Sequence, residues 1–560
     1  MSGGKEPRNV RLLCALALLA ALVACTLAYL PTLDGGFLSD DYSVLGALYA
    51  WAGEQRLVAT LLAKFGQGLD APSHYYRPLP MMSFAANYVL AGAHPLPWRL
   101  TNLGIHLASG ALVFAIAMRL RESDATQRPI IGPMFAAAVF LAFPTNIEAV
   151  AWVSGRYDLL ALTFMLATVA CFQRSQSWRD GWGIAGLVAA ACALASKESA
   201  ALLPVFVLAV AVSRRWSEGS ASALALGIRD ATPWLILGAA YFALRTAIFG
   251  TPFRVYPGTS PVEALFGGDW LRPLASSGPW LAAAMPGPVA RIAFLAALVA
   301  LIGTGALVRS DRPRLRGSWL AIAFTAAMSL ILLLPHVASL APNGEQGRLF
   351  YTTSALLALL VAWPWLSRTG AGSRLRHAWR LVVTVVLLVS EIALLRAALE
   401  SWIDAGRQAT ALVAALPRAA QTIPRGGYGL VLVPDHLGNV PFGRNAQGGL
   451  VSPPVQSETL SNRLLVQTPV DLPQWPTHIA RGLVEALQRY PLSEVWTAVG
   501  ERRATGSLAP THHFCWAAGA REIELLRWPA DPAGDDWLAA WRNALGESRC
   551  DASARELAAL

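Results

Sequence analysis

Long apolar runs recur from the N-terminus to about residue 397, and this repetition most limits what the chain can fold into. Each run has about 17 to 25 residues, which is enough for a helix to cross the hydrocarbon core of a bilayer. Only 14% of the 560 residues are charged, whereas a soluble domain has about 25%. We therefore predict an α-helical polytopic membrane protein.

The apolar runs predict about 11 spans. They lie at about 12–31, 100–118, 133–149, 157–173, 182–197, 199–213, 232–249, 288–308, 318–335, 349–366 and 379–397. The spans 182–197 and 199–213 meet at Ser196-Lys197-Glu198 with almost no loop between them. One continuous helix there would make the number of spans even instead of odd. We interpret the first run as a retained helix because it is too long for a typical signal peptide and has no clear cleavage site.

The distribution of basic residues predicts the orientation. Lys and Arg number 19 in the loops on the N-terminal side and nine in the opposite loops up to residue 348. This bias places the N-terminus in the cytoplasm and, with an odd span count, the C-terminal segment outside. The net charge of +10 therefore reflects topology, and we expect no nucleic-acid partner.

Two parts outside the spans have their own organisation. Residues 32–99 form a first external loop with amphipathic helices, which would lie at the membrane interface. Residues 1–397 would thus form the transmembrane domain, and residues 398–560, richer in polar residues, a small external α/β domain. There we predict strands at 430–433, 493–499 and 522–526 and helices at 479–489 and 536–545. Cys515 and Cys550 lie in this domain and could form a disulfide.

Adjacent carboxylates, Asp40 and Asp41, follow the first span directly. One can act as a base while the other positions it or binds a divalent cation such as Mg²⁺ or Mn²⁺. The alternative is that the two acids only mark a helix end that faces water. The six cysteines and nine histidines show no spacing typical of a metal site.

Other ionisable residues gather in loops on the predicted external side. Such groups near membrane depth are candidates for function. They are Glu148, Arg156 and Asp158 after the third span, Lys197 and Glu198 between the fifth and sixth, and Arg348 with Tyr351 before the tenth. Each has a structural alternative. Glu148 and Arg156 could form a structural ion pair, and Lys197 and Glu198 could snorkel at a helix end. Arg348 could anchor a helix at the level of the lipid headgroups. His106, within the second predicted span, could be a histidine packed in the core.

The order of these motifs resembles the GT-C glycosyltransferases, and most of all the transmembrane O-mannosyltransferases with tetratricopeptide repeats and their bacterial relatives. The resemblance covers about residues 12–397, and the repeats are missing here. It rests on Phe37-Leu-Ser-Asp-Asp41, Tyr76-Arg77-Pro-Leu79, Asn102-Leu-Gly-Ile-His106, the segment from Phe143-Pro to Asp158, Ser196-Lys-Glu198 and Arg348-Leu-Phe-Tyr351.

The resemblance implies a GT-C-like enzyme of the cell inner membrane. It would transfer a sugar, with inversion, from a polyprenyl-phosphate donor to a glycan, lipid or protein acceptor, with Asp40 or Asp41 as the base. The residues expected to bind substrate are Tyr76, Arg77, His106, Glu148, Arg156, Asp158, Lys197, Glu198, Arg348 and Tyr351. A flippase or transporter, or a ligase of lipid-linked saccharides, is the competing hypothesis. Transporters, however, tend to place ionisable residues near the midplane of two related halves, a pattern that we do not find.

Overall fold

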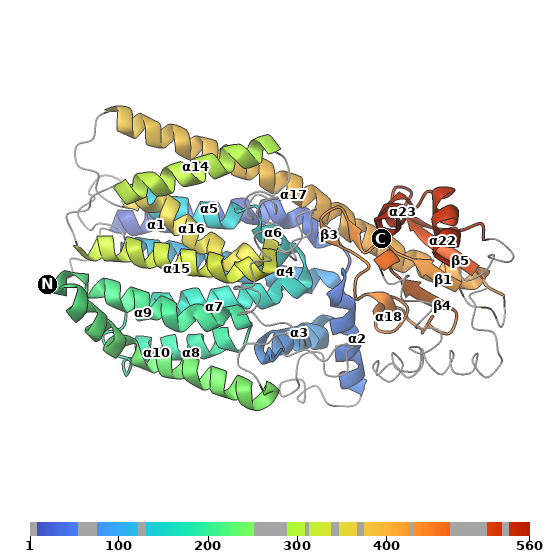
Figure 1. The fold of residues 1–560 in the computed structure, drawn as a ribbon, viewed down its shortest axis with the longest axis horizontal. Coiled ribbons are helices and arrows are strands. Elements are labelled where there is room, and N and C mark those ends of the chain that lie inside the picture. The colour runs from blue at the N-terminus through green and yellow to red at the C-terminus, as the bar shows by residue number, and fades with distance from the viewer. Residues whose placement is uncertain are drawn as a thin grey trace. The chain divides into compact units, whose positions relative to one another are not determined.

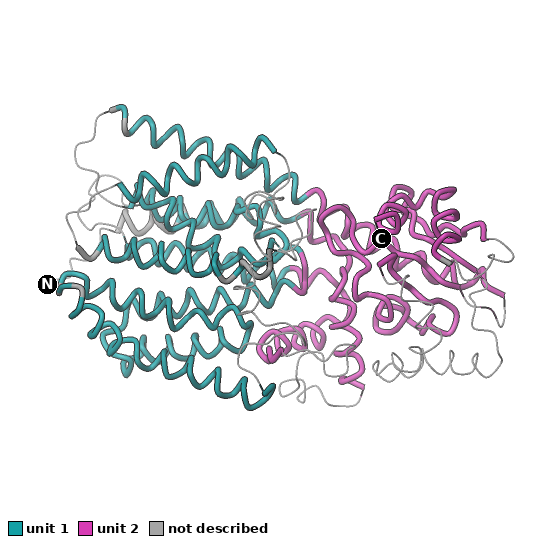
Figure 2. Tube along the Cα trace, in the orientation of Figure 1, with its two compact units in different colours: residues 1–30, 100–151, 155–399 teal, residues 31–99, 152–154, 400–560 magenta. Residues whose placement is uncertain are grey.

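The computed structural model describes residues 8–53, 75–120, 130–250, 288–307, 313–337, 347–366, 374–424, 427, 429–470, 512–528 and 537–559. They form two compact units, each made of segments that are distant in the sequence (Figure 2). Unit 1 comprises residues 1–30, 100–151 and 155–399, and unit 2 comprises residues 31–99, 152–154 and 400–560. The predicted first external loop thus falls in the same unit as the predicted C-terminal domain. The division of the chain at residue 397 stays a prediction.

Unit 1 is a bundle of helices that lie side by side (Figure 1). Its longer helices are α1 Arg8–Tyr29, α4 Pro95–Leu120, α5 Ile131–Ala142, α7 Arg156–Phe172, α8 Gly181–Leu194, α9 Leu203–Arg214, α10 Ser220–Phe249, α14 Pro288–Leu307, α15 Pro313–Val337, α16 Tyr351–Leu366 and α17 Arg374–Thr422, which continues into unit 2. The short helix α6 Asn146–Ala151 and the 3₁₀ turns η4 Glu198–Leu202 and η6 Gly347–Phe350 connect them.

Multi-pass membrane character is confirmed by the helices of the described residues. Six of these helices are long and apolar enough to cross a membrane, and shorter apolar helices accompany them. A helix lies at each of the 11 predicted ranges, but the number of spans stays a prediction. Around Ser196 the chain breaks, because α8 ends at Leu194 and α9 begins at Leu203 after a 3₁₀ turn.

The helix ends follow the local sequence. Asp180 caps α8, since its carboxylate accepts a hydrogen bond of 2.7 Å from the backbone N–H of Gly183. Helix α10 ends at Gly250, whose φ of 74° lies in the left-handed region that favours glycine. Pro204 lies in the first turn of α9, where its missing N–H costs no helical hydrogen bond.

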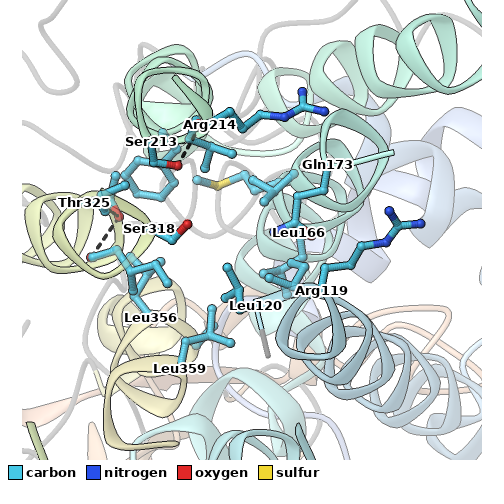
Figure 3. Close-up of a pocket in the computed structure, with 18 of the residues that line it drawn as sticks. Arg119, Leu120, Leu166, Gln173, Ser213, Arg214, Ser318, Thr325, Leu356 and Leu359 are labelled. Carbon is cyan, nitrogen blue, oxygen red and sulfur yellow. Dashed lines mark hydrogen bonds between the residues drawn. The ribbon is translucent and has the colours of Figure 1, made fainter. Parts of the chain in front are cut away.

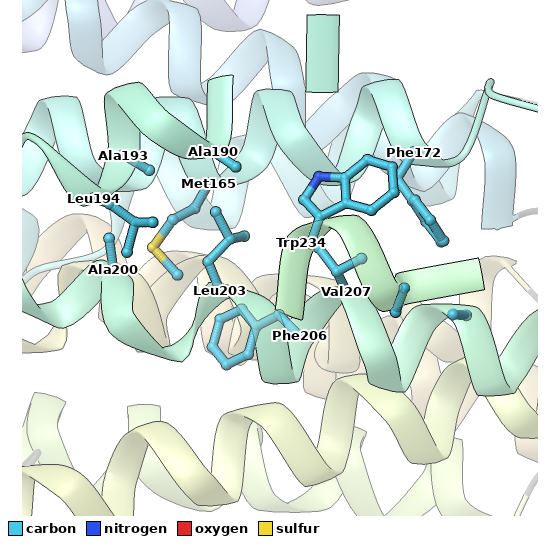
Figure 4. Packing of buried hydrophobic residues seen from close by; sticks show 12 residues of the cluster. Met165, Phe172, Ala190, Ala193, Leu194, Ala200, Leu203, Phe206, Val207 and Trp234 are labelled. Carbon is cyan, nitrogen blue, oxygen red and sulfur yellow. The ribbon is translucent and has the colours of Figure 1, made fainter. Parts of the chain in front are cut away.

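Small and large apolar residues pack together in the core between α7, α8, α9 and α10 (Figure 4). The rings of Phe172 and Trp234 meet edge to face, with centroids 5.0 Å apart. Ala190, Ala193 and Ala200 are fully buried beside them. Small residues let helix backbones approach closely in a membrane, where packing rather than water exclusion drives association.

Unit 2 combines two helices of the first loop with a sheet from the C-terminal part. Helices α2 Asp40–Gly53 and α3 Pro78–Ala91 lie where amphipathic pieces were predicted. Strands β1 Gly429–Leu432, β4 Leu464–Gln467, β5 His512–Ala517 and β6 Glu522–Leu525 form one sheet in the order β4-β1-β5-β6. Strand β1 is parallel to both neighbours, and β6 is antiparallel to β5.

The sheet packs against helices α22 Trp537–Gly546 and α23 Asp551–Ala558 through a core that includes Leu430, Cys515 and Trp541. The expected disulfide is present between Cys515 and Cys550. Strands 430–433 and 522–526 and the helix 536–545 lie close to their predicted positions, whereas β4 and β5 were not predicted. The predicted elements 479–489 and 493–499 lie outside the described residues.

Candidate functional site

Asp40 and Asp41 begin helix α2, directly after the irregular segment 35–39. Ser39, at φ 49°, turns the chain into the helix. Gly35 and Gly36, which precede Ser39, let this part of the backbone approach α17 closely. The backbone N–H of Gly36 donates a hydrogen bond to the carbonyl of Gly406 in α17 at 2.8 Å. A Cβ atom at Gly36 would lie 3.0 Å from the backbone nitrogen of Thr410. The Gly-Gly pair thus sets the backbone that carries the carboxylates.

Asp41 is buried, and both of its oxygens are engaged. Oδ2 accepts a hydrogen bond of 3.0 Å from the backbone N–H of Leu38. Oδ1 accepts two from Ser154, at 2.8 Å from the backbone N–H and 2.6 Å from the hydroxyl. Trp152 donates its indole N–H to the carbonyl of Leu38 at 3.1 Å. Asp41 therefore joins the start of α2 to residues 152–154.

Burial raises the pKa of Asp41 from 3.8 to about 6, although the hydrogen bonds from Ser154 and Leu38 and the charge of Arg99 act in the opposite direction. Arg99 is itself buried, and its guanidinium donates to the carbonyls of Thr32, at 3.0 Å, and Gly36. A buried carboxylate that interacts with a cation and accepts several hydrogen bonds holds its surroundings in one arrangement. This pattern is typical of a positioning residue.

Asp40 has a different environment. Its side chain is half-buried, and Oδ1 accepts a hydrogen bond of 2.7 Å from the side-chain amide of Asn445. The hydroxyl of Ser43 donates to the carbonyl of Asn445 at 2.6 Å, and Asn445 adopts a φ of 56°. Within the described part of the chain, Oδ2 of Asp40 accepts no hydrogen bond. Asp40 can therefore accept a proton from a bound molecule without first losing a contact at that oxygen.

Tyr76 and Arg77, also in unit 2, lie immediately before α3. Both are half-buried. The guanidinium of Arg77 stacks over the ring of Tyr75, with its central carbon 3.9 Å from the ring centroid. Two proline residues in the first turn of α3, Pro78 and Pro80, fix the direction in which the helix starts.

In unit 1 the candidate ionisable residues form pairs between segments that are far apart in the sequence. Glu148 in α6 pairs with Arg348 in η6, and its second oxygen also accepts from the Arg348 backbone N–H at 3.2 Å. Lys197 and Asp158 form an ion pair of 2.6 Å. Glu198 lies 3.6 Å from Arg245. Glu148 thus has Arg348 as an ion-pair partner, and Lys197 has Asp158.

Arg156, His106 and Tyr351 are buried inside unit 1. The Nε of Arg156 donates to the side-chain carbonyl of Asn102 at 2.8 Å. Nδ1 of His106 lies 2.8 Å from the hydroxyl of Tyr351, and Nε2 lies 3.2 Å from the carbonyl of Leu141. With both ring nitrogens engaged, His106 has the arrangement of a packed core histidine.

The sequence suggested that Asp41 could be a ligand of a divalent cation. Among the described residues, no group of three or more His, Cys, Asp or Glu side chains could hold a metal ion. The oxygens of Asp41 already accept hydrogen bonds from Leu38 and Ser154. Mg²⁺ needs octahedral oxygen coordination, so these residues do not fit the cation as they stand.

Several side chains that make these contacts were absent from the predicted site, among them Arg99, Ser154, Arg245 and Asn445. Ser154 lies within a recognised motif, two residues before Arg156, and could have been found from that position. Asn445 lies 405 residues from Asp40 and carries no signal in its neighbourhood. Arg99 lies next to a predicted span and is one of the nine basic residues of the predicted external loops, where it counts only toward the orientation.

Together, the fold and these buried polar contacts define a multi-pass helical membrane protein with an acidic pair at the first helix of unit 2 and ion-paired loops in unit 1. No protein-family model matches the sequence. The chain is 35% identical over 191 residues to Protein O-mannosyl-transferase Tmtc1 of Drosophila melanogaster, which covers 32% of this chain and 21% of that protein.

Two further relatives give the same picture. Identity to Protein O-mannosyl-transferase Tmtc2 of Drosophila melanogaster is 35% over 194 residues, covering 32% of this chain and 20% of that protein. Identity to Protein O-mannosyl-transferase TMTC2 of Homo sapiens is 30% over 205 residues, covering 34% and 23%. The matches thus span about a fifth of each relative. The resemblance to the transmembrane O-mannosyltransferases is confirmed, and these relatives are membrane glycosyltransferases.

Among solved structures, the chain is similar to ArnT from Cupriavidus metallidurans, whose crystal structure has undecaprenyl phosphate bound. The TM-score is 0.45, with 14% sequence identity over 83% of this chain and 94% of that one.

Proposed function

We propose that this protein is a membrane glycosyltransferase. It transfers a sugar from a polyprenyl-phosphate donor to an acceptor hydroxyl on the external face of the cell inner membrane. The partial identity to O-mannosyl-transferases supports the class of reaction. The observation that carries the proposal is the division of labour between two adjacent carboxylates. Asp41 is buried and saturated with hydrogen bonds, whereas Asp40 is half-buried and keeps one oxygen for a substrate.

In this reaction Asp40 is the base. The oxygen of the acceptor hydroxyl attacks the anomeric carbon, its proton passes to Oδ2 of Asp40, and the bond between the anomeric carbon and the phosphate oxygen breaks with its electron pair on the phosphate. Attack from the face opposite the phosphate inverts the anomeric centre. Because phosphate leaves readily, one carboxylate suffices, in contrast to the pair that a glycoside hydrolase needs.

Arg348 is the proposed ligand for the donor phosphate. Its side chain is 22% exposed, whereas the side chain of its partner Glu148 is only 5% exposed. Glu148 would therefore hold the guanidinium in place while the guanidinium meets the developing charge on the phosphate. Lys197, held by Asp158, is a second cation with a partly exposed side chain. Arg156 is fully buried, which favours a structural role beside Asn102.

The decisive experiment replaces the proposed base, Asp40. Purified protein in lipid would be given a panel of polyprenyl-phosphate sugars, with a membrane extract as the source of acceptor. We expect the wild type to transfer sugar and Asp40→Asn to lose at least about 100-fold of its rate, the size of effect typical for a general base. Glu458→Gln, which changes an exposed carboxylate of unit 2, is the matched control.

Full transfer by a folded Asp40→Asn variant would remove Asp40 as the base. Movement of the lipid-linked sugar across the bilayer without transfer, by wild type and variant alike, would replace the enzyme with a flippase.

A further inference from the structure

Unit 1 contains a cavity of about 400 Å³ between α4, α7, α9, α15 and α16 (Figure 3). Along α7 its lining runs from Leu162 to Gln173. At 1.5 Å per residue this is about 16 Å, or roughly half the thickness of the hydrocarbon core of a bilayer. The volume lies within the range of ligand-binding pockets. The cavity therefore has the length of one lipid chain in one leaflet.

The lining is basic at one end and mostly apolar along the rest, where Thr325 and Thr352 lie among Leu, Ile, Val, Met and Phe side chains. Arg119, Gln173 and Arg214 lie at or just beyond the C-terminal ends of α4, α7 and α9. Figure 3 shows these three side chains on one side of the cavity and Leu356 and Leu359 on the other. No Asp or Glu occurs among the residues that line it in the described structure. This distribution suits an amphipathic ligand with a negative head.

Two observations at the polar end point to a bound group. The side-chain oxygen Oε1 of Gln173 is buried and has no hydrogen-bond partner within the described structure. A buried acceptor without a donor is costly, so a ligand that brings a hydroxyl would be stabilised there. Arg214 is held in place, because its guanidinium donates to the carbonyls of Phe172 at 3.1 Å and Ser175 at 3.0 Å. Its charge is thereby fixed beside the cavity.

The same end of the bundle leads into the loops rich in Lys and Arg. The segments 119–128, 174–181, 214–229 and 309–317 follow or precede the helices that line the polar end. The excess of basic residues predicts that this end is cytoplasmic. A ligand that entered here would come from the cytoplasmic leaflet, where anionic lipids attract basic residues near the surface.

We propose that this cavity binds an anionic glycerophospholipid whose headgroup carries a hydroxyl, such as phosphatidylglycerol. Arg119 and Arg214 contact the phosphate, the headgroup hydroxyl donates to Oε1 of Gln173, and one acyl chain lies along the apolar lining. A polyprenyl phosphate shares the phosphate and the chain but lacks the headgroup hydroxyl. The inference is independent of the proposed reaction, because it involves none of the residues assigned to it.

The test measures retained lipid by native mass spectrometry of the full chain. Delipidated protein would be incubated separately with dioleoyl-phosphatidylglycerol, dioleoyl-phosphatidylcholine and decaprenyl phosphate. We expect phosphatidylglycerol to bind at least roughly tenfold more tightly than phosphatidylcholine, because phosphatidylcholine has no headgroup hydroxyl for Gln173 and carries a quaternary ammonium that the two arginines repel. In a second series, decaprenyl phosphate is added at equal concentration to the protein with phosphatidylglycerol bound, and we expect it not to displace that lipid. Equal retention of the two phospholipids, or displacement of phosphatidylglycerol by decaprenyl phosphate, would overturn the proposal.

Variants locate the lipid. Arg119→Gln combined with Gln173→Leu should lose the preference for phosphatidylglycerol, and Ala355→Phe should reduce retention of the lipid by filling the cavity wall. Arg179→Gln removes an exposed arginine from the same end and is the matched control. If Arg179→Gln lowered retention as much as the double variant, binding would reflect general surface charge, and the cavity would not be the site. The double variant spares Arg214, whose contacts with Phe172 and Ser175 support the end of α7.

Discussion

The side-chain amide of Asn445 donates a hydrogen bond of 2.7 Å to the carboxylate of Asp40, across 405 positions of sequence. Asp40 begins the first helix of unit 2, and Asn445 lies in a turn of its C-terminal part. The bond engages Oδ1 and leaves Oδ2 to meet a substrate. A segment that the sequence placed in a separate domain thus orients the proposed base.

Removing the amide should therefore slow transfer. We expect Asn445→Gly to lower kcat/KM by roughly tenfold, because a hydrogen bond to a charged group is worth about 1.5 to 3 kcal/mol and part of it is replaced by water. Glycine is the appropriate substitute because Asn445 has a positive φ. Transfer kinetics at matched protein abundance would measure the effect. Asn543→Ala, at an exposed position in α22, is the control, and unchanged kinetics for Asn445→Gly would show that the contact is not needed.

Stability should depend on pH through Asp41. Its pKa in the folded state is raised from 3.8 to about 6, so the folded protein binds the proton more tightly than the unfolded chain does. The stabilisation is complete below pH 4 and is lost as pH rises through about 6, a change of about 3 kcal/mol. Thermal unfolding of wild type and Asp41→Asn between pH 4 and 7 would measure it. Parallel pH profiles for the two proteins would contradict the assignment.

Breaking the pair between Glu148 and Arg348 should leave a buried charge uncompensated. We expect Arg348→Met to destabilise the protein by about 1 to 3 kcal/mol, less than a fully buried pair would cost because Arg348 is partly exposed. The double variant Arg348→Met with Glu148→Gln should recover part of the loss, since it removes both charges. Unfolding midpoints of the single and double variants measure the coupling. Additive losses would mean that the two side chains do not interact.

The disulfide between Cys515 and Cys550 should stabilise the C-terminal part of unit 2. The two cysteines lie 35 residues apart and join strand β5 to the residue before helix α23. Removing a disulfide that closes a loop of this length typically lowers the free energy of unfolding by about 2 to 4 kcal/mol. Limited proteolysis of a Cys515→Ser, Cys550→Ser variant should therefore cut within 512–559 faster than in the wild type. Cys192→Ser, which changes a free cysteine of unit 1, should leave the rate unchanged.

Chelation tests whether sugar transfer requires a divalent cation. A cation bound to Asp41 would have to displace the donors Leu38 and Ser154 from its oxygens. We therefore expect sugar transfer to continue in EDTA. A rate that fell in EDTA and returned with added Mg²⁺ or Mn²⁺ would show that substrate binding rearranges these contacts or that the cation is held by the substrate itself.

The sequence by itself determined that the chain is a multi-pass helical membrane protein, because apolar runs of spanning length have few other stable states. It also located the acidic pair at Asp40 and Asp41 and most of the ionisable residues that form ion pairs within unit 1. These features are local, since they depend on composition and on distance from a span.

Only the tertiary structure decided the partners. Asn445 contacts Asp40, Ser154 contacts Asp41, and Arg348 contacts Glu148. Nothing near these residues in the sequence selects one polar group over another. Coulomb attraction and hydrogen bonding act between whichever groups packing brings within about 3 Å, and packing depends on the whole chain.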